Sequence, residues 1–361
     1  MLLTSLSVQH VRRINAAQIY PSSDINLISG ANGSGKTSLL ESIHYLATAR
    51  SFRTARVADV ISHGQSTLVV SGELTDTAGH NSRVGVEKTS SSTRLKFNGE
   101  AVTIASKIAR LVPVLTFNTE SYLLLDGGPA NRRALLDRML FHVEHDYLKE
   151  LKTYYRGLKQ RNSLLRSRAS REQVSSWDHQ LSPSAMKIDL WRSDCVSTIN
   201  DYLAISPLVE AIGPLQLEYR RGWDAGHEYG KMLESNWLKD RAGGITALGP
   251  HRAELRIKIG EKLAKSVVSR GQGKLIIAAI VCAQASYLRD HGREIPILLI
   301  DDLASELDRA ARHISAEAIL GIQAQVFFTA IEGSDLPERV GECARRFLVE
   351  HGQISASPGK G

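Results

Sequence analysis

The chain has 361 residues, of which 42% are hydrophobic, so it can bury a substantial core in one large or two medium domains. Its net charge of +7 favours a polyanionic partner or an anionic surface, although excess charge can also serve solubility alone. The three widely spaced cysteines, Cys195, Cys282 and Cys343, argue against a disulfide framework and a zinc site. The longest apolar run, residues 275–283, is too short to span a bilayer, and we expect a soluble, cytoplasmic protein with no membrane partner.

The first hundred residues predict strands around a glycine-rich turn. Residues 1–30 alternate like β-strands, and the apolar segment 25–29 leads directly into the turn. Apolar residues then recur at helical spacing. Residues 67–104 contain strand-like segments separated by turn residues, and Asn98-Gly99 is a strong hairpin signal. We therefore predict an α/β nucleotide domain with an antiparallel β subdomain beside it.

The glycine-rich turn fits the pattern G-x-x-x-x-G-K-[ST] of phosphate loops. Glycines let the backbone wrap around phosphates, and the next helix points its positive end at them. Lys36 can reach the β- and γ-phosphates and assist catalysis, while the Thr37 hydroxyl can ligate Mg²⁺. The alternative is a chance glycine-rich turn between a strand and a helix. The predicted nucleotide contacts are Gly30, Ala31, Asn32, Gly33, Ser34, Gly35, Lys36, Thr37 and Ser38.

Residues 130–240 are mostly helical by pattern, and Pro129 stands where the first turn of a helix accepts proline. From Tyr147 to Glu172 the chain carries eight Lys or Arg and two acidic residues. A heptad-like apolar seam should face the interior of a long helix here. Its members are Leu148, Leu151, Tyr155, Leu158 and Leu165.

Basic residues lie beside this seam. Lys152, Lys159 and Arg166 recur every seven residues, and Arg156 is nearby. Such a row can neutralise several phosphates of DNA and release counterions. The alternative is a solvated helix flank whose long side chains cover apolar surface. The pairs Arg132-Arg133 and Arg220-Arg221 are further candidates, or surface pairs that link the two lobes.

The last third of the chain returns to strands and glycine turns. An apolar strand over residues 295–300 delivers Asp301 and Asp302 at its C-terminal end. Asp301 suits Mg²⁺, and Asp302 could orient or deprotonate an attacking water. Two acidic turn residues after a buried strand are the alternative. Earlier, the segment S-R-G-Q places Ser269, Gly271 and Gln272 at the start of a predicted helix, where hydroxyl and N–H groups favour an anion.

These patterns divide the chain into three segments. We expect residues 1–125 to form the N-terminal half of the nucleotide domain, with the phosphate loop and the β subdomain. Residues 126–240 should form an inserted helical lobe, and residues 241–361 the C-terminal half of the nucleotide domain.

The motifs together resemble those of ABC-type ATPases. S-R-G-Q resembles their signature motif, and "ASELD" at residues 304–308 resembles the D-loop that follows the Asp-Asp strand. "ARSFRT", "GGPANRRALLD", "LKQRN" and "GPHRAEL", in order from residue 1 to about 355, resemble the RecF family. Rad50 and SMC proteins carry hundreds of coiled-coil residues between the two halves of the ATPase domain. The insert in this chain is too short to form such a coiled-coil arm.

The resemblance implies a Rad50/SMC-head-like ATPase fold that binds ATP and Mg²⁺. ATP would drive homodimerisation, with Ser269 of one subunit facing the γ-phosphate held by the other, and slow hydrolysis stimulated by DNA would release the dimer. The ligand would be DNA at gaps and single-strand–duplex junctions. The implied role is to help RecO and RecR load RecA in gap repair, replication-fork recovery and SOS induction, close to the nucleoid.

Two positions depart from the general ABC pattern. Asp302 stands where most such ATPases have glutamate, and a shorter carboxylate is consistent with slow turnover. Thr329 lies near the place of the usual switch histidine.

Two other function classes share the phosphate loop. A transporter ATPase subunit would need a membrane partner and would gain nothing from a basic insert, and a P-loop kinase would not need the signature and D-loop segments.

Overall fold

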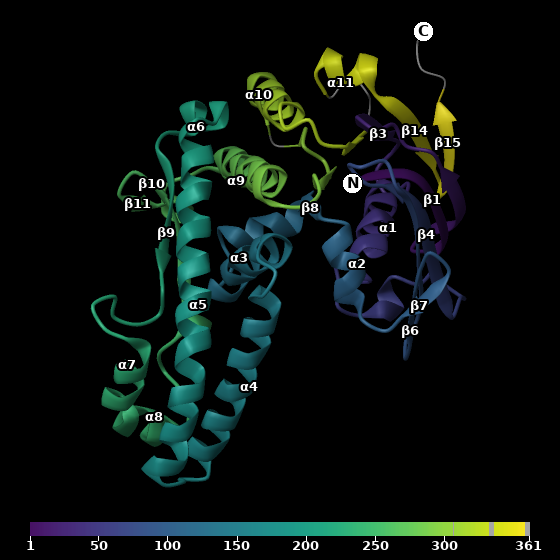
Figure 1. Cartoon of the computed structure of the whole chain (residues 1–361). Coiled ribbons are helices and arrows are strands. Elements are labelled where there is room, and N and C mark those ends of the chain that lie inside the picture. Colours follow the sequence, from purple (N-terminus) through teal and green to yellow (C-terminus); the bar gives the residue numbers. More distant parts are fainter. Residues whose placement is uncertain (306, 332–335, 358–361) are drawn as a thin grey trace. The chain divides into compact units, whose positions relative to one another are not determined.

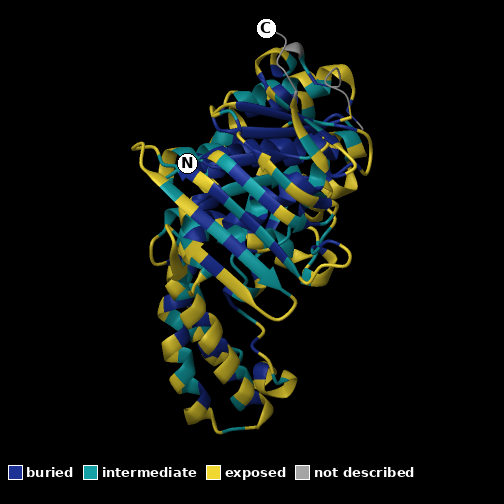
Figure 2. Cartoon of the chain, turned by 90° about the vertical axis from the view of Figure 1, so that its right-hand side faces the viewer, coloured by how far each residue is buried: buried dark blue, intermediate teal, exposed yellow. Residues whose placement is uncertain are grey.

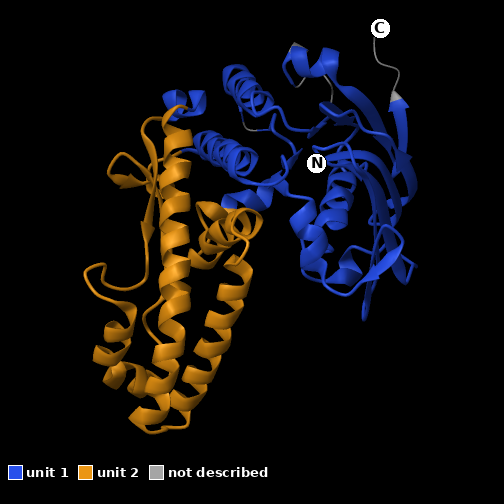
Figure 3. Ribbon diagram, in the orientation of Figure 1, with its two compact units in different colours: residues 1–122, 206–212, 269–361 blue, residues 123–205, 213–268 orange. Residues whose placement is uncertain are grey.

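The computed structural model describes residues 1–305, 307–331 and 336–357. They form two compact units (Figure 1, Figure 3). Unit 1 comprises residues 1–122, 206–212 and 269–361, and unit 2 comprises residues 123–205 and 213–268. No helix in the described part of the chain is both long and apolar enough to cross a bilayer.

A six-stranded, mostly parallel sheet forms the centre of unit 1. Its order is β15-β14-β3-β13-β12-β8, and only the β14–β15 pair is antiparallel. Every residue of β12 and β13 is buried, as expected for parallel strands covered on both faces. The strands are β3 (Ile25–Ser29), β8 (Val114–Phe117), β12 (Ile297–Ile300), β13 (Val326–Ala330), β14 (Arg345–Glu350) and β15 (Gln353–Ser357).

The helices of unit 1 include the two that begin at the predicted motifs. Helix α1 follows the phosphate loop, and α9 begins at the S-R-G-Q segment and is buried along most of its length. The bounds are α1 (Lys36–Thr48), α2 (Ala105–Leu111), α6 (Pro207–Ile212), α9 (Arg270–His291), α10 (Arg309–Leu320) and α11 (Glu338–Cys343), with a short 3-10 turn η1 (Val57–Asp59). A second 3-10 turn, η2 (Thr119–Leu124), begins in unit 1 and ends in the first residues of unit 2. Residue 306 of the predicted D-loop lies outside the described residues.

A second, antiparallel sheet of unit 1 has the order β2-β1-β4-β5-β6-β7. Buried and more exposed residues alternate along β4, so one face packs on α1 and the other faces solvent (Figure 2). Asn98 and Gly99 both have positive φ in the predicted hairpin turn, which a two-residue turn of this kind requires. The strands are β1 (Leu2–Val11), β2 (Ile14–Ile19), β4 (Thr67–Thr75), β5 (Asn81–Thr89), β6 (Thr93–Phe97) and β7 (Glu100–Val102).

Unit 2 is mainly helical, and a small sheet of order β11-β10-β9 lies beside its helices. Helix α3 begins at Pro129, as its position predicted, and α4 and α5 pack together. The helices are α3 (Pro129–Val143), α4 (Tyr147–Arg166), α5 (Arg171–Ala204), α7 (Tyr229–Ser235) and α8 (Trp237–Gly243), with 3-10 turns η3 (Pro250–Arg252) and η4 (Ala264–Ser266). The strands are β9 (Leu215–Arg220), β10 (Glu254–Ile259) and β11 (Lys262–Leu263).

The compact units differ from the expected segments in two places. Residues 206–212, which the sequence assigned to the inserted lobe, belong to unit 1, and the other difference lies after residue 240. Residues 241–268 belong to unit 2 and not to unit 1, which contains the predicted phosphate loop. The reason is strand pairing, because β10 forms an antiparallel ladder with β9 from Glu254–Arg220 to Ile259–Leu215. The glycine turns and alternation in this segment therefore describe a sheet of the inserted lobe.

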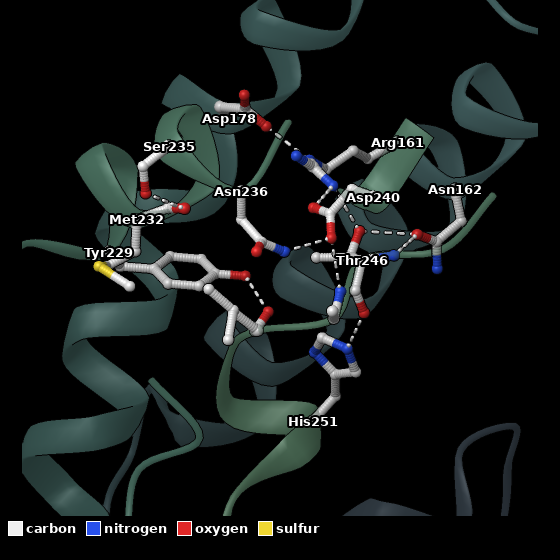
Figure 4. Close-up of polar contacts among 12 residues, drawn as sticks. Arg161, Asn162, Asp178, Tyr229, Met232, Ser235, Asn236, Asp240, Thr246 and His251 are labelled. Atoms are coloured by element: carbon white, nitrogen blue, oxygen red, sulfur yellow. Dashed lines mark hydrogen bonds and ion pairs between the residues drawn. The ribbon is translucent and has the colours of Figure 1, made fainter. Parts of the chain in front are cut away.

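A buried ionic network fixes the end of unit 2 where α4, α5 and α8 meet (Figure 4). Arg161 of α4 is fully buried, and its guanidinium contacts Asp178 at 2.6 Å and Asp240 at 2.7 Å. It also donates to the hydroxyl of Thr246 at 2.8 Å. The same threonine is held by Asn162, whose side-chain oxygen accepts its backbone N–H at 2.8 Å. One cation therefore ties two helices and a loop to α4.

We predict that Arg161→Leu strongly destabilises unit 2. Removing the cation leaves two carboxylates in the interior without compensation, which costs about 3–5 kcal/mol. Urea denaturation followed by circular dichroism measures the loss. The control is Gln160→Leu, because Gln160 is exposed on the same helix. A loss below about 1 kcal/mol for Arg161→Leu would show that the ion pairs add little.

Candidate nucleotide-binding site

The phosphate loop connects β3 to α1, as the sequence predicted. Gly30, Gly33 and Gly35 have φ values of 150°, 75° and 124°, which side-chain-bearing residues rarely adopt. The ammonium of Lys36 donates to the carbonyl oxygens of Gly30 at 2.6 Å and Ala31 at 3.0 Å. Partial burial lowers the pKa of Lys36, and the nearby carboxylates of Asp301 and Asp302 oppose that shift. Lys36 therefore lies over the loop, within the field of both aspartates.

Two turns far away in the sequence hold the loop in shape. Arg13, in the β1–β2 turn, donates to the carbonyl oxygen of Gly33 at 2.5 Å. Gly352, in the β14–β15 turn, donates its N–H to the carbonyl oxygen of Ser34 at 2.9 Å. A Cβ on Gly352 would lie 2.0 Å from the carbonyl oxygen of Arg13, so only glycine fits. The backbone of the loop is thus fixed from both sides by ordinary hydrogen bonds.

Asp301 lies at the C-terminal end of β12, one strand away from the loop. Its carboxylate accepts the hydroxyl of Thr37 at 3.0 Å and the hydroxyl of Thr329 at 2.7 Å. Thr329 is a buried residue of β13, the strand between β3 and β12, so its hydroxyl reaches the carboxylate from the neighbouring strand. Burial raises the pKa of Asp301 above its ordinary value, and the two hydroxyl bonds oppose that rise.

The pair Thr37 and Asp301 fits Mg²⁺. Neighbouring ligands of an octahedral Mg²⁺ at about 2.0–2.1 Å are roughly 2.9 Å apart. The Thr37 hydroxyl lies 3.0 and 3.1 Å from the two carboxylate oxygens of Asp301, so small shifts suffice to place an ion between them. Two protein oxygens leave the remaining positions for phosphates and water, which is the usual arrangement for this cation. Among the described residues, no cluster of three or more His, Cys, Asp or Glu forms a self-contained metal site.

Asp302 has a strained backbone conformation. Its φ of 53° lies in the left-handed region, which aspartate tolerates at a cost of about 1–2 kcal/mol. Its N–H donates to the Thr329 hydroxyl at 2.9 Å. The residue is exposed, and no hydrogen bond or ion pair within the described ranges engages its carboxylate. That carboxylate is therefore available to a water molecule.

The predicted signature segment forms the N-terminus of α9. Ser269 is the N-cap, and its hydroxyl accepts the N–H of Gln272 at 3.3 Å while the Gln272 side chain accepts the N–H of Ser269 at 3.0 Å. This capping box uses the lone pairs of the hydroxyl but leaves its proton free to donate. Gly271 lies in the same exposed first turn. The geometry suits an anion that approaches from outside.

The predicted DNA-binding row lies on α4. Lys152, Arg156, Lys159 and Arg166 are all exposed, so the row is free to contact a ligand. The predicted seam is wrong at one position, because Tyr155 is 43% exposed. Tyr154 is buried in its place and its hydroxyl contacts His251 at 2.7 Å. The true helical period of 3.6 residues shifts the interior face away from a strict seven-residue repeat.

The other basic pairs have structural roles. Arg132 forms an ion pair with Glu254 at 2.8 Å, and Arg133 donates to the carbonyl oxygen of Ala253. Arg221 forms an ion pair with Asp189, and Arg220 pairs with a glutamate on its own strand. These arginines hold unit 2 together, since each of these partners belongs to that unit.

Sequence reasoning missed several residues of the site. Arg13 and Gly352 are single residues in turns and match no motif. The place of Thr329 was predicted, but its contact with Asp301 was not. The positive φ of Asp302 could not be predicted from the sequence either, because aspartate is common in turns of many kinds.

Comparison with known proteins decides the family. Residues 2–354 match the RecF/RecN/SMC N-terminal domain family. The DNA replication and repair protein RecF of Yersinia enterocolitica is 37% identical over 363 residues, which cover 99% of both chains. The chain belongs to the RecF family. The RecF protein of Thioalkalivibrio sulfidiphilus is 36% identical over 98% of this chain and 99% of its own.

Solved structures confirm the predicted fold class. A structure of the recombination mediator protein RecF with ATP has a TM-score of 0.85 at 22% identity and covers 99% of this chain and 98% of its own. An SMC head bound to the C-winged helix domain of ScpA has a TM-score of 0.60 at 13% identity, covering 99% and 97%. This member of the RecF family therefore has the ABC-type, SMC-head-like ATPase fold.

We predict that Gly352→Ala impairs nucleotide binding without unfolding the protein. The added methyl group would clash with the Arg13 carbonyl, so the turn must withdraw its hydrogen bond from Ser34. Affinity for ATP should fall about tenfold, as measured by titration with a fluorescent ATP analogue. Gly64→Ala is the control, because it also has positive φ but nothing lies within 4 Å of its Cβ position. Equal effects of both changes would contradict the proposed role of this turn.

Proposed function

We propose that this RecF family member is an ATPase that binds DNA and closes into a homodimer when it binds ATP. The observation that carries the proposal is that one chain holds two complementary half-sites. One is the phosphate loop with the Thr37–Asp301 oxygen pair, and the other is the capped N-terminus of α9 with a free hydroxyl proton at Ser269. In the dimer, each ATP lies between the first half-site of one chain and the second half-site of the other.

Hydrolysis uses groups that the phosphate loop and β12 already position. Lys36 and the loop N–H groups hold the β- and γ-phosphates. Thr37 and Asp301 would hold Mg²⁺, which would supply further positive charge to the phosphate groups. Asp302 accepts a proton from water as its oxygen attacks the γ-phosphorus. The bond from that phosphorus to the ADP oxygen breaks, which gives ADP and inorganic phosphate. Because the aspartate is short and strained, we expect slow turnover. Stimulation of this turnover by DNA is the expectation that the resemblance to the RecF family implies.

DNA is the proposed ligand of the exposed row on α4. The row carries four cations on the exposed face of one helix, in a protein with a net charge of +7. The similar RecF proteins are DNA replication and repair proteins, and the similar solved RecF structure is that of a recombination mediator of the RecFOR pathway. We accordingly propose that this protein recognises gapped or junction DNA and acts with RecO and RecR to load RecA, in the cytoplasm, during gap repair, fork recovery and SOS induction.

The composite ATP site can be tested by mixing two inactive variants. Lys36→Ala removes the phosphate-holding ammonium, and Ser269→Arg places a bulky cation at the tight N-terminus of α9. We predict that neither variant hydrolyses ATP alone, whereas the mixture recovers part of the activity, because a mixed dimer contains one complete site. Steady-state phosphate release and sedimentation with ATP give the measurements. If Ser269→Arg alone dimerises like the wild type, the composite site is incorrect.

The DNA-binding row predicts a change in salt dependence. Replacing Lys152, Lys159 and Arg166 with glutamine should weaken binding to all sequences alike. If each residue contacts one phosphate, the slope of log K against log salt falls by about 3 × 0.9 for duplex DNA. The control replaces the exposed Lys231, Lys239 and Arg241 of the same unit, which changes the net charge equally. A slope equal to that of the control would mean that the row is a solvated flank.

A further inference from the structure

A buried lysine lies on the signature helix, beyond the residues that the predicted site uses. Lys274 is five residues after Ser269 on α9 and is only 9% exposed. Its ammonium donates to the carbonyl oxygen of Ser305 at 2.6 Å, to the hydroxyl of the same residue, and to the carbonyl oxygen of Asp302 at 3.4 Å. A cation is stable in such a position only when oxygen atoms replace its water shell.

These contacts help to hold the backbone of Asp302 in place. The N–H of this residue donates to Thr329, and its carbonyl oxygen accepts from Lys274 and from the Ser305 hydroxyl at 3.3 Å. Both peptide groups around a strained residue with φ of 53° are therefore held from outside. A left-handed conformation at a non-glycine residue persists only when its surroundings impose it. Of these three anchors, Thr329 belongs to β13, Lys274 belongs to the signature helix, and Ser305 lies three residues after Asp302.

We propose that Lys274 is a positioning residue that couples the signature helix to the water-activating Asp302 of the same chain. The inference rests on the proposed dimer. In that dimer, Ser269 of one chain contacts the ATP held by its partner, whereas Asp302 of the same chain acts on the ATP held by its own Lys36. The helix and the aspartate therefore serve different nucleotides, and Lys274 connects them. Through Lys274, α9 holds Asp302 in the geometry that hydrolysis of the ATP bound by its own chain requires.

The first test is the variant Lys274→Met, which keeps the length of the side chain and removes its three donors. ATP-dependent dimerisation and KM for ATP should stay close to the wild-type values, whereas kcat should fall at least tenfold. Lys274→Arg restores charge and donors and should recover part of kcat. The control is Lys265→Met, which changes an exposed lysine of η4 and should alter neither quantity. Wild-type kcat in Lys274→Met would overturn the proposal.

The second test separates positioning of Asp302 from simple support of the signature helix. Mixed dimers of Lys36→Ala and Ser269→Arg contain one complete site, in which the acting Asp302 belongs to the Ser269→Arg chain and the acting Ser269 to the other. Lys274→Met added to the Ser269→Arg chain should abolish the recovered hydrolysis. The same change in the Lys36→Ala chain should leave most of it. An equal or larger loss from the second placement would overturn the proposal.

Two further measurements keep these outcomes distinct. Thermal unfolding followed by circular dichroism shows whether Lys274→Met is folded. If it is not folded, the variant Ser305→Gly is tested in its place. This change removes the hydroxyl that bridges Lys274 and the carbonyl oxygen of Asp302. Ser305→Gly should then lower kcat and leave dimerisation intact, and an unchanged kcat would again overturn the proposal. If the wild type itself does not dimerise with ATP, the proposed function fails. The comparison of kcat between Lys274→Met and the wild type still decides whether Lys274 positions Asp302.

Discussion

The geometry of the site depends on the carboxylate of Asp301. It lies at the end of β12 and accepts hydroxyls from Thr37, after β3, and from Thr329, in β13. Three adjacent parallel strands therefore converge on one partly buried group, because the carboxyl ends of parallel strands meet at the same edge of a sheet. A shift of β12 or β13 by one residue would turn its carboxylate or hydroxyl away from the other groups. The register of the sheet is thus part of the chemistry of the site.

Hydrogen bonds from other segments of the chain make the site around Asp301 rigid. Arg13 and Gly352 fix the phosphate loop, while Thr329 and Lys274 fix the two peptide groups of Asp302. Each of these bonds joins segments of one compact unit, so the preorganisation does not depend on the placement of the helical unit. Preorganised dipoles and charges are the main means by which a phosphoryl-transfer site lowers its barrier.

The sequence predicts the local parts of this site well. The strand, glycine turn and helix around Lys36 follow from a contiguous pattern, and so does the strand that ends at Asp301. The contacts of Thr329 and Lys274 could not be predicted, because they depend on which strands become neighbours and on how a helix rotates against them. Tyr155 shows the same limit within one helix, since periodicity identified a buried face but misplaced its edge by one residue. The misplaced boundary at residue 240 arose because strand pairing between β9 and β10 is not local.

The discontinuous course of the chain also governs how the protein folds during synthesis. Strand β3 pairs with β13 and β14, and the bonded residues Asn26 and Val326 are 300 positions apart. Ribosomes add roughly 5–20 residues per second, so β3 waits on the order of 15–60 s for its neighbours. Throughout that interval an apolar strand has no partner, which favours aggregation and makes the nascent chain a natural client of chaperones. All of unit 2 leaves the ribosome before the central sheet of unit 1 can close.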